Sequence, residues 1–172
     1  MTKLWKNGRF VADTFVTVDD ATPLPRATPV IVSLKRWRES RAEVLALSVP
    51  VGVLVEPTSV LLAESDALDK LALIVIPFAK FTDGRGYSLA RRLRDQLDFH
   101  GEVRATGEVL IDQIPLMLRC GFDGFAIAHG PTLRVLESGD LPVVPEVYQT
   151  AVYGRARTTP NFVSRPLLQA AE

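Results

Sequence analysis

Leu71-Ala-Leu-Ile-Val-Ile-Pro-Phe-Ala-Lys-Phe-Thr-Asp-Gly-Arg-Gly-Tyr-Ser88 is the stretch of sequence that decides the fold. Its apolar first part, Leu71 to Ile76, predicts a buried strand, and its polar, glycine-rich part, Lys80 to Ser88, predicts a turn. Leu89, Leu93 and Leu97 then recur every four residues and predict an amphipathic helix, with Arg91, Arg92 and Arg94 off the apolar stripe. A second short strand at 102–105 completes a βαβ unit, in which ligands bind beyond the carboxyl ends of the strands.

The same alternation extends to both sides of this unit. Apolar strand patterns start near residues 30, 51, 72, 102 and 123, and each gap contains a helix pattern. This spacing predicts an α/β fold with a mostly parallel sheet of four to five βα units. Such a sheet is either half-barrel-like or open and doubly wound, and the spacing does not separate the two. A complete single-chain barrel is excluded because it needs eight units.

The two ends of the chain differ from this central part. Asn7-Gly8 between two short apolar segments predicts an N-terminal β-hairpin, and Thr14 to Val18 would extend its second strand. Prolines between 21 and 29 predict an extended connector, so we expect residues 1–28 to cover an edge of the sheet or to contact a partner subunit. An α/β domain at 29–150 and an extended or disordered tail at 151–172 would follow.

A helix is predicted at 108–119, and it is apolar nearly all round. It would therefore be buried or face a subunit. Pro115 lies inside it, lacks a backbone donor and should kink it. Another helix is predicted at 33–47, and a short one at 132–137.

Composition excludes several classes of protein. The 172 residues are 47% hydrophobic and 23% charged, which is ordinary for one globular domain. Twenty basic and twenty acidic residues argue against a nucleic-acid binder. No apolar run approaches the ~20 residues of a membrane helix, and no signal-peptide core is present, so a cytoplasmic location is expected. One cysteine excludes an intramolecular disulfide, a cysteine-based zinc site and an Fe–S cluster, and the two histidines have no metal-ligand spacing.

The glycine-rich turn has the features of an anion site. Gly84 and Gly86 would let the backbone turn with its amides exposed, at the positive end of the following helix. Charge-assisted hydrogen bonds would come from basic side chains at the sheet rim. The candidate anion-binding residues are Gly84, Arg85, Gly86, Ser88 and Arg104, with Lys80 beside them. Two alternatives remain open: Thr82 or Asp83 simply caps the helix, and Arg104 pairs with Glu56, Asp83 or Glu108.

A catalytic role requires side chains to converge on the same rim. Lys80, Asp83 and Glu108 would then form a general acid/base set acting on a carbonyl or phosphate substrate. Cys120 is expected to be a buried structural thiol rather than a nucleophile. The sequence contains no nicotinamide or flavin fingerprint, so any cofactor is unknown.

Several segments resemble the bacterial family known as domain of unknown function 934. They are Phe78–Ser88, Gly101–Gly107, Val109–Gln113, Arg119–Asp123 and Tyr148-Gln149, within a resemblance that covers about residues 28–150. Pro115 and the Pro/Arg-rich tail depart from the family pattern. The resemblance implies an oxidoreductase or accessory protein of assimilatory sulfur (sulfite) metabolism, because genes of this family tend to lie beside sulfite or nitrite reductase genes.

Three functions follow from the residues and the resemblance together. The first is an accessory protein that binds an oxyanion or small anionic metabolite at the 80–88 turn. The second is the acid/base enzyme, and an oxidoreductase would need a cofactor held by a partner or bound in an unrecognised way. The third is a non-catalytic module that docks on a sulfite or nitrite reductase through the hairpin or the 108–119 helix, with a homodimer as the alternative use of that apolar surface.

Overall fold

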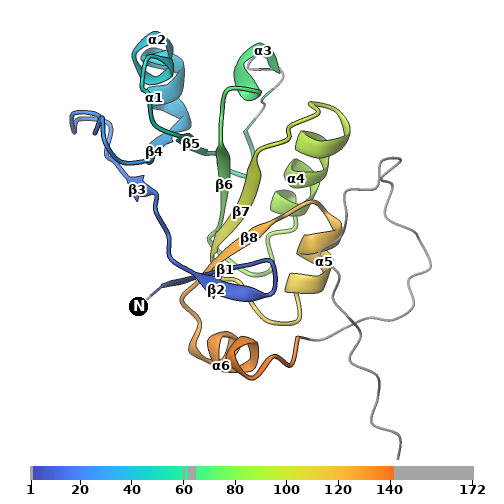
Figure 1. Cartoon of the computed structure of the whole chain (residues 1–172). Coiled ribbons are helices and arrows are strands. Elements are labelled where there is room, and N and C mark those ends of the chain that lie inside the picture. Colours follow the sequence, from blue (N-terminus) through green and yellow to red (C-terminus); the bar gives the residue numbers. More distant parts are fainter. Residues whose placement is uncertain (1, 60, 62–64, 142–172) are drawn as a thin grey trace, which may run out of the picture.

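Eight strands form one mixed sheet in the computed structural model, which describes residues 2–59, 61 and 65–141 (Figure 1). Their order across the sheet is β2-β1-β8-β7-β6-β5-β4-β3. The strands are β1 (Lys3–Lys6), β2 (Arg9–Val11), β3 (Val16–Thr17), β4 (Val30–Ser33), β5 (Val51–Leu54), β6 (Leu73–Phe78), β7 (Glu102–Gly107) and β8 (Gly124–Ile127). The helices are α1 (Leu34–Glu39), α2 (Arg41–Leu45), α3 (Ser65–Leu68), α4 (Arg85–Asp95), α5 (Ile114–Arg119) and α6 (Gly130–Ser138).

The sheet curls as a half-barrel because its parallel strands lie side by side in sequence order. β3 to β8 are all parallel, and each pairs with the next. Right-handed crossovers between strands that always advance in one direction place the helices of those crossovers on the same face. A doubly wound sheet would need a reversal of strand order, and this chain has none between β3 and β8. The predicted mostly parallel α/β fold is thus confirmed, in its half-barrel form.

The N-terminal hairpin is confirmed, and it covers one edge of the sheet. Asn7 and Gly8 have φ angles of 52° and 78°, which the tight turn requires. β1 pairs antiparallel with β8, and Leu4 lies opposite Ala126. The prediction that Thr14 to Val18 extends the second strand is wrong. β2 ends at Val11, and the chain passes to the opposite edge (Figure 1), where Val16 and Thr17 pair with β4.

The two faces of the sheet are covered differently. Alternate strand residues such as Ile74, Val103 and Phe125 are buried in the main core, which the helices complete. On the other face, called the inner face below, Ile31, Leu73 and Val75 form a smaller cluster with Phe15 and Leu54 packed against it. Phe15 belongs to residues 12–15, called the crossing segment below, which connect β2 to β3. The chain itself therefore covers part of the inner face.

Two helix predictions need correction. The segment predicted as one helix at 33–47 forms two, because the first ends at Glu39 and Ser40 lies between it and the second. The apolar helix predicted at 108–119 starts only at Ile114. Pro115 therefore lies in the first turn, where no backbone donor is needed, and the predicted kink within a longer helix is wrong. The short helix expected at 132–137 is confirmed as α6. The predicted tail at 151–172 lies outside the described residues.

A proline shapes the carboxyl-terminal rim of the sheet. The amide of Val55 donates to the carbonyl of Val75. The backbone N–H and C=O groups of the alternate residues 73, 75 and 77 of β6 therefore point toward β5. Pro77 has no N–H to continue that ladder. β5 accordingly ends at Leu54, whereas β6 stays paired with β7 as far as Phe78 and Gly107. The turn after β6 is thereby directed toward the loop after β7.

Candidate functional site

The turn between β6 and α4 is fixed to the loop after β7 through the backbone of Phe81. Its amide donates to Oε2 of Glu108 at 2.8 Å, and its carbonyl accepts from Nε2 of Gln113 at 2.7 Å. The amide of Glu108 in turn donates to the carbonyl of Phe78 at 2.8 Å. Because both polar groups of the Phe81 backbone are held, the turn has one defined position at the rim. The side chain of Phe81 remains 48% exposed.

The start of α4 contains a local carboxylate–guanidinium pair. Oδ1 of Asp83 accepts from the backbone amide of Arg85 at 3.1 Å and from its Nε at 2.8 Å, and Oδ2 accepts from Nη2 at 2.6 Å. The hydrogen bond from the Arg85 side chain is the main reason that the pKa of Asp83 falls from 3.8 to about 2. Asp83 thus caps the first free amide of α4, as one of the open alternatives predicted.

Two glycines on either side of Arg85 have different surroundings. Gly84 is the residue that precedes α4, no side chain caps the helix from this position, and nothing lies within 4 Å of where its Cβ would be. A Cβ on Gly86 would lie 2.5 Å from Cζ of the buried Phe78 ring. Gly86 therefore allows the first turn of α4 to pack closely on β6. Gly84 leaves the adjacent backbone open to solvent.

Replacing Gly86 with alanine is expected to destabilise the protein by about 2 kcal/mol, because the buried Phe78 ring must move to accept the methyl group. Gly84→Ala is the matched control, and it should change the free energy of unfolding by less than about 1 kcal/mol since its Cβ meets no atom. Urea unfolding of both variants, followed by circular dichroism, measures the difference. Equal losses in the two variants would contradict the assigned packing.

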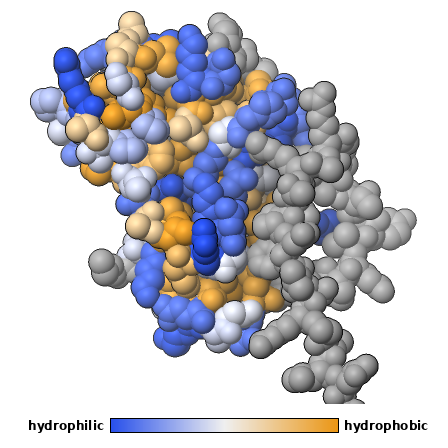
Figure 2. Space-filling view, in the orientation of Figure 1, coloured by the Kyte–Doolittle hydropathy of each residue, from blue (hydrophilic) through white to orange (hydrophobic). Residues whose placement is uncertain are grey.

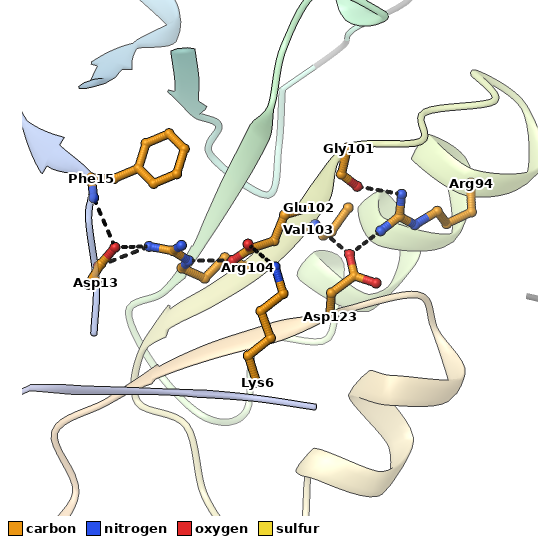
Figure 3. A network of polar contacts seen from close by, with 9 residues as sticks. All are labelled: Lys6, Asp13, Phe15, Arg94, Gly101, Glu102, Val103, Arg104 and Asp123. Atoms are coloured by element: carbon orange, nitrogen blue, oxygen red, sulfur yellow. Dashed lines mark hydrogen bonds and ion pairs between the residues drawn. The ribbon is translucent and has the colours of Figure 1, made fainter. Parts of the chain in front are cut away.

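Arg104 lies in the middle of β7 and its side chain is on the inner face, only 3% exposed. Its Nε donates to Oε1 of Glu102 at 2.7 Å, and its Nη1 donates to Oδ2 of Asp13 at 2.9 Å (Figure 3). Nζ of Lys6 donates to the other oxygen of Glu102 at 2.6 Å. The prediction that Arg104 pairs with Glu56, Asp83 or Glu108 is therefore wrong. We call these four side chains the inner-face network; it ties the crossing segment to β7 and the hairpin.

A second cluster of polar contacts surrounds Arg94 at the opposite, amino-terminal edge of the parallel strands (Figure 3). The guanidinium pairs with Asp123 and donates to the carbonyls of Gly121 at 3.0 Å and Gly101 at 2.8 Å. Asp123 also accepts from the amide of Val103 at 2.9 Å. The Arg94 side chain is 5% exposed. This cluster joins the end of α4 to the loops before β7 and β8, a structural role.

The three candidate catalytic residues lie at the same rim, but two of them already form hydrogen bonds or ion pairs with other groups of the chain. Asp83 is paired with Arg85, and Glu108 accepts from the Phe81 amide, whereas Lys80 is exposed. A general base works best with a pKa near the working pH, and the pKa of Asp83 is about 2. The geometry therefore favours binding over proton transfer. Among the other anion candidates, Ser88 lies exposed in the first turn of α4.

The remaining candidate residues have structural surroundings. Cys120 is buried, and burial raises the pKa of its thiol, as expected for a structural cysteine. Nδ1 of His129 lies 2.9 Å from the hydroxyl of Thr132 at the start of α6. Within the described part of the chain, no three His, Cys, Asp or Glu side chains gather as a metal site. No helix of that part is long and apolar enough to cross a membrane.

Sequence reasoning missed the inner-face network, although one signal for it was present. Val103 and Ala105 are apolar and lie in the main core, so the period of two places Glu102 and Arg104 together on the opposite face.

Comparison with known proteins concerns the central part of this architecture. The model of a family described as "Bacterial protein of unknown function (DUF934)" matches residues 52–159. No curated protein and no solved structure gives a significant match.

Proposed function

This chain belongs to the DUF934 family of bacterial proteins of unknown function, and we propose that it is an accessory protein of sulfite reduction which binds a small oxyanion at the first turn of α4. The open backbone at Gly84, with no side chain capping the helix from that position, is the observation that carries the proposal. The link to sulfite reduction comes from the family resemblance. The binding chemistry comes from the site.

Three features support oxyanion binding at this turn. The first amides of a helix have no intrahelical acceptor, and Asp83 takes that of Arg85. The next two amides belong to buried Gly86 and half-buried Tyr87, and an anion at the open Gly84 backbone would accept from them. The aligned peptide dipoles favour a negative group there. Arg85 uses Nε and Nη2 on Asp83, which leaves Nη1 as a charge-assisted donor, and exposed Lys80 adds a second positive charge. A sulfite or sulfate ion has enough oxygens to accept from several of these donors.

Asp83 gives the proposal a sharp test, because its carboxylate holds Arg85 and also repels an incoming anion. Arg85→Gln should weaken sulfite binding about tenfold, since a charge-assisted bond is lost. Asp83→Asn should strengthen it, because the repulsion is removed and Arg85 is released. Isothermal titration with sulfite, sulfate and phosphate measures both effects, and Arg92→Gln, further along α4, is the matched control. Absence of binding for all three ions, or equal affinities in all variants, would overturn the proposal.

A second candidate function is docking on a sulfite or nitrite reductase, and two exposed apolar side chains favour it. Phe81 and Leu116 are each 48% exposed. Gln113 holds the backbone of Phe81 and lies three residues before Leu116, so both side chains lie near the start of α5. A rigid aromatic side chain at a surface is a typical binding anchor. In Figure 2, hydrophilic and hydrophobic areas are interspersed over the described part of the surface in that view, unlike the large apolar face of an obligate interface.

Replacing Phe81 with serine is expected to weaken co-purification with sulfite reductase at least about tenfold, as loss of an aromatic anchor does. Leu116→Ser should have a smaller effect in the same direction. Val16→Ser is the control, because Val16 is 47% exposed but lies on β3 at the far edge of the sheet. If light scattering instead shows a dimer that Phe81→Ser dissociates, the surface serves self-association. Unchanged capture and unchanged mass in Phe81→Ser would remove docking through this surface.

A further inference from the structure

A depression of about 480 Å³ lies away from the rim, at the amino-terminal side of the parallel strands. It is lined on one side by Leu24 and Arg26 of the connector that precedes β4. Glu43 of α2 and Leu47 and Ser48, which precede β5, form its other side. Because the candidate anion site is at the opposite end of the strands, this depression requires a separate explanation.

The lining of the depression combines half-buried apolar side chains with two opposite charges. Leu24 and Leu47 are half-buried and pack against the main core, so they provide the fixed apolar part. Arg26 and Glu43 are exposed, and within the described residues neither forms an ion pair or a side-chain hydrogen bond. A guanidinium and a carboxylate that line the same hollow without pairing are free to bind a ligand that carries both opposite charges.

We propose that this depression binds a free α-amino acid with an aliphatic side chain. The guanidinium of Arg26 receives the α-carboxylate, for which its planar donor geometry is suited. The carboxylate of Glu43 accepts from the α-ammonium group, and the aliphatic side chain lies on Leu24 and Leu47. The volume is within the range of small-molecule sites. A polyanionic ligand is disfavoured because Glu43 would repel it. Both charges are exposed, so the expected dissociation constant is about 1 mM.

Isothermal titration of the full chain with L-leucine tests this assignment, with two analogues that each lack one charge. Leucinamide lacks the carboxylate, and 4-methylpentanoate lacks the ammonium group. We expect leucine to bind and each analogue to bind at least about tenfold more weakly. Arg26→Gln should weaken leucine binding to the level of leucinamide, and Glu43→Gln to the level of 4-methylpentanoate. Arg9→Gln, on the hairpin, is the matched control and should bind leucine like the wild type.

The exposed positions of Arg26 and Glu43 mean that both variants should fold, which circular dichroism verifies. Absence of leucine binding up to about 20 mM would overturn the proposal. So would equal binding of leucine and 4-methylpentanoate, which would indicate a simple anion site at Arg26. Leucine binding that neither Arg26→Gln nor Glu43→Gln changes would place the ligand elsewhere and also overturn it.

Discussion

Replacing Arg94 with alanine is expected to lower the free energy of unfolding by about 3 kcal/mol, because it removes a buried guanidinium whose donors join Asp123 to backbone carbonyls of two loops. The side chain is 5% exposed and donates to Asp123 and to the carbonyls of Gly101 and Gly121. Urea unfolding at pH 7, followed by circular dichroism and tryptophan fluorescence, measures the loss. Arg94→Lys should recover only part of it, since an ammonium group cannot reach acceptors on several sides at once.

Arg91 is the matched control, on the same helix and of the same residue type. Its side chain is 49% exposed and forms an ion pair with Asp95 at 3.8 Å. Arg91→Ala should therefore cost no more than about 0.5 kcal/mol, the usual contribution of an exposed pair between residues four apart in a helix. Similar losses for Arg91→Ala and Arg94→Ala would mean that the contacts of Arg94 contribute nothing beyond those of a surface arginine.

The different roles of these two arginines show where sequence patterns stop being informative. The leucines at 89 and 93 of α4 predict its apolar stripe, and both are buried as expected. Arg91 and Arg94 both lie off that stripe, so periodicity treats them alike. What separates them is the position of backbone carbonyls in the loops before β7 and β8. Backbone acceptors carry no residue-specific signal, so nothing in the sequence marks Arg94 as buried.

The fold was more predictable than the site because it depends on local patterns repeated along the chain. Five strand–helix alternations define the parallel sheet, and strands that advance in sequence order produce the half-barrel. The turn at residues 80–88 and its capping alternative were also readable, because Asp83 and Arg85 are only two residues apart. By contrast, Glu108 and Phe81 are 27 residues apart, and their contact depends on the pairing of β6 with β7 up to Phe78 and Gly107.

Arg104 shows the same limit at longer range. A strand ending at Ala105 would place Arg104 close to the rim, but β7 continues to Gly107, and Arg104 therefore lies mid-strand on the inner face. Its partner Asp13 is 91 residues away, in a segment whose sequence indicates only a continuation of the hairpin. The partner is near because the crossing segment runs from one edge of the sheet to the other. The path of the crossing segment depends on the whole sheet, because it connects β2 at one edge to β3 at the other.

Replacing Arg104 with methionine is expected to cost about 3 kcal/mol at pH 7, and less as the pH falls. Methionine retains the apolar stem that packs near Phe15, whose ring centroid lies 5.5 Å from the guanidinium. The lost stability is therefore mainly electrostatic. It arises because Glu102, whose side chain is 11% exposed, loses its ion pair with Arg104. Asp13 is 39% exposed and can be hydrated, so Asp13→Asn should cost less than Arg104→Met.

The pH dependence follows from the pKa of Glu102. Burial alone raises this pKa, but hydrogen bonds from Arg104 and Lys6 outweigh burial and hold it below 4.5. A carboxyl group with a lowered pKa in the folded state stabilises the protein above its unfolded pKa, and that stability is lost as the pH falls through the folded value. Arg104→Met removes the strongest lowering contribution, so the gap between wild type and variant should be widest above about pH 5 and should close toward acid.

A double variant separates this explanation from a loss of packing. In Arg104→Met with Glu102→Gln the buried carboxylate is absent, so the double variant should be more stable at pH 7 than Arg104→Met alone. Its stability difference from Arg104→Met should also shrink at low pH, where Glu102 is protonated in both states. Urea unfolding between about pH 3 and pH 7 measures all of these differences. A loss in Arg104→Met that is the same at every pH would show that Arg104 stabilises the inner face by packing, and that its charge contributes nothing.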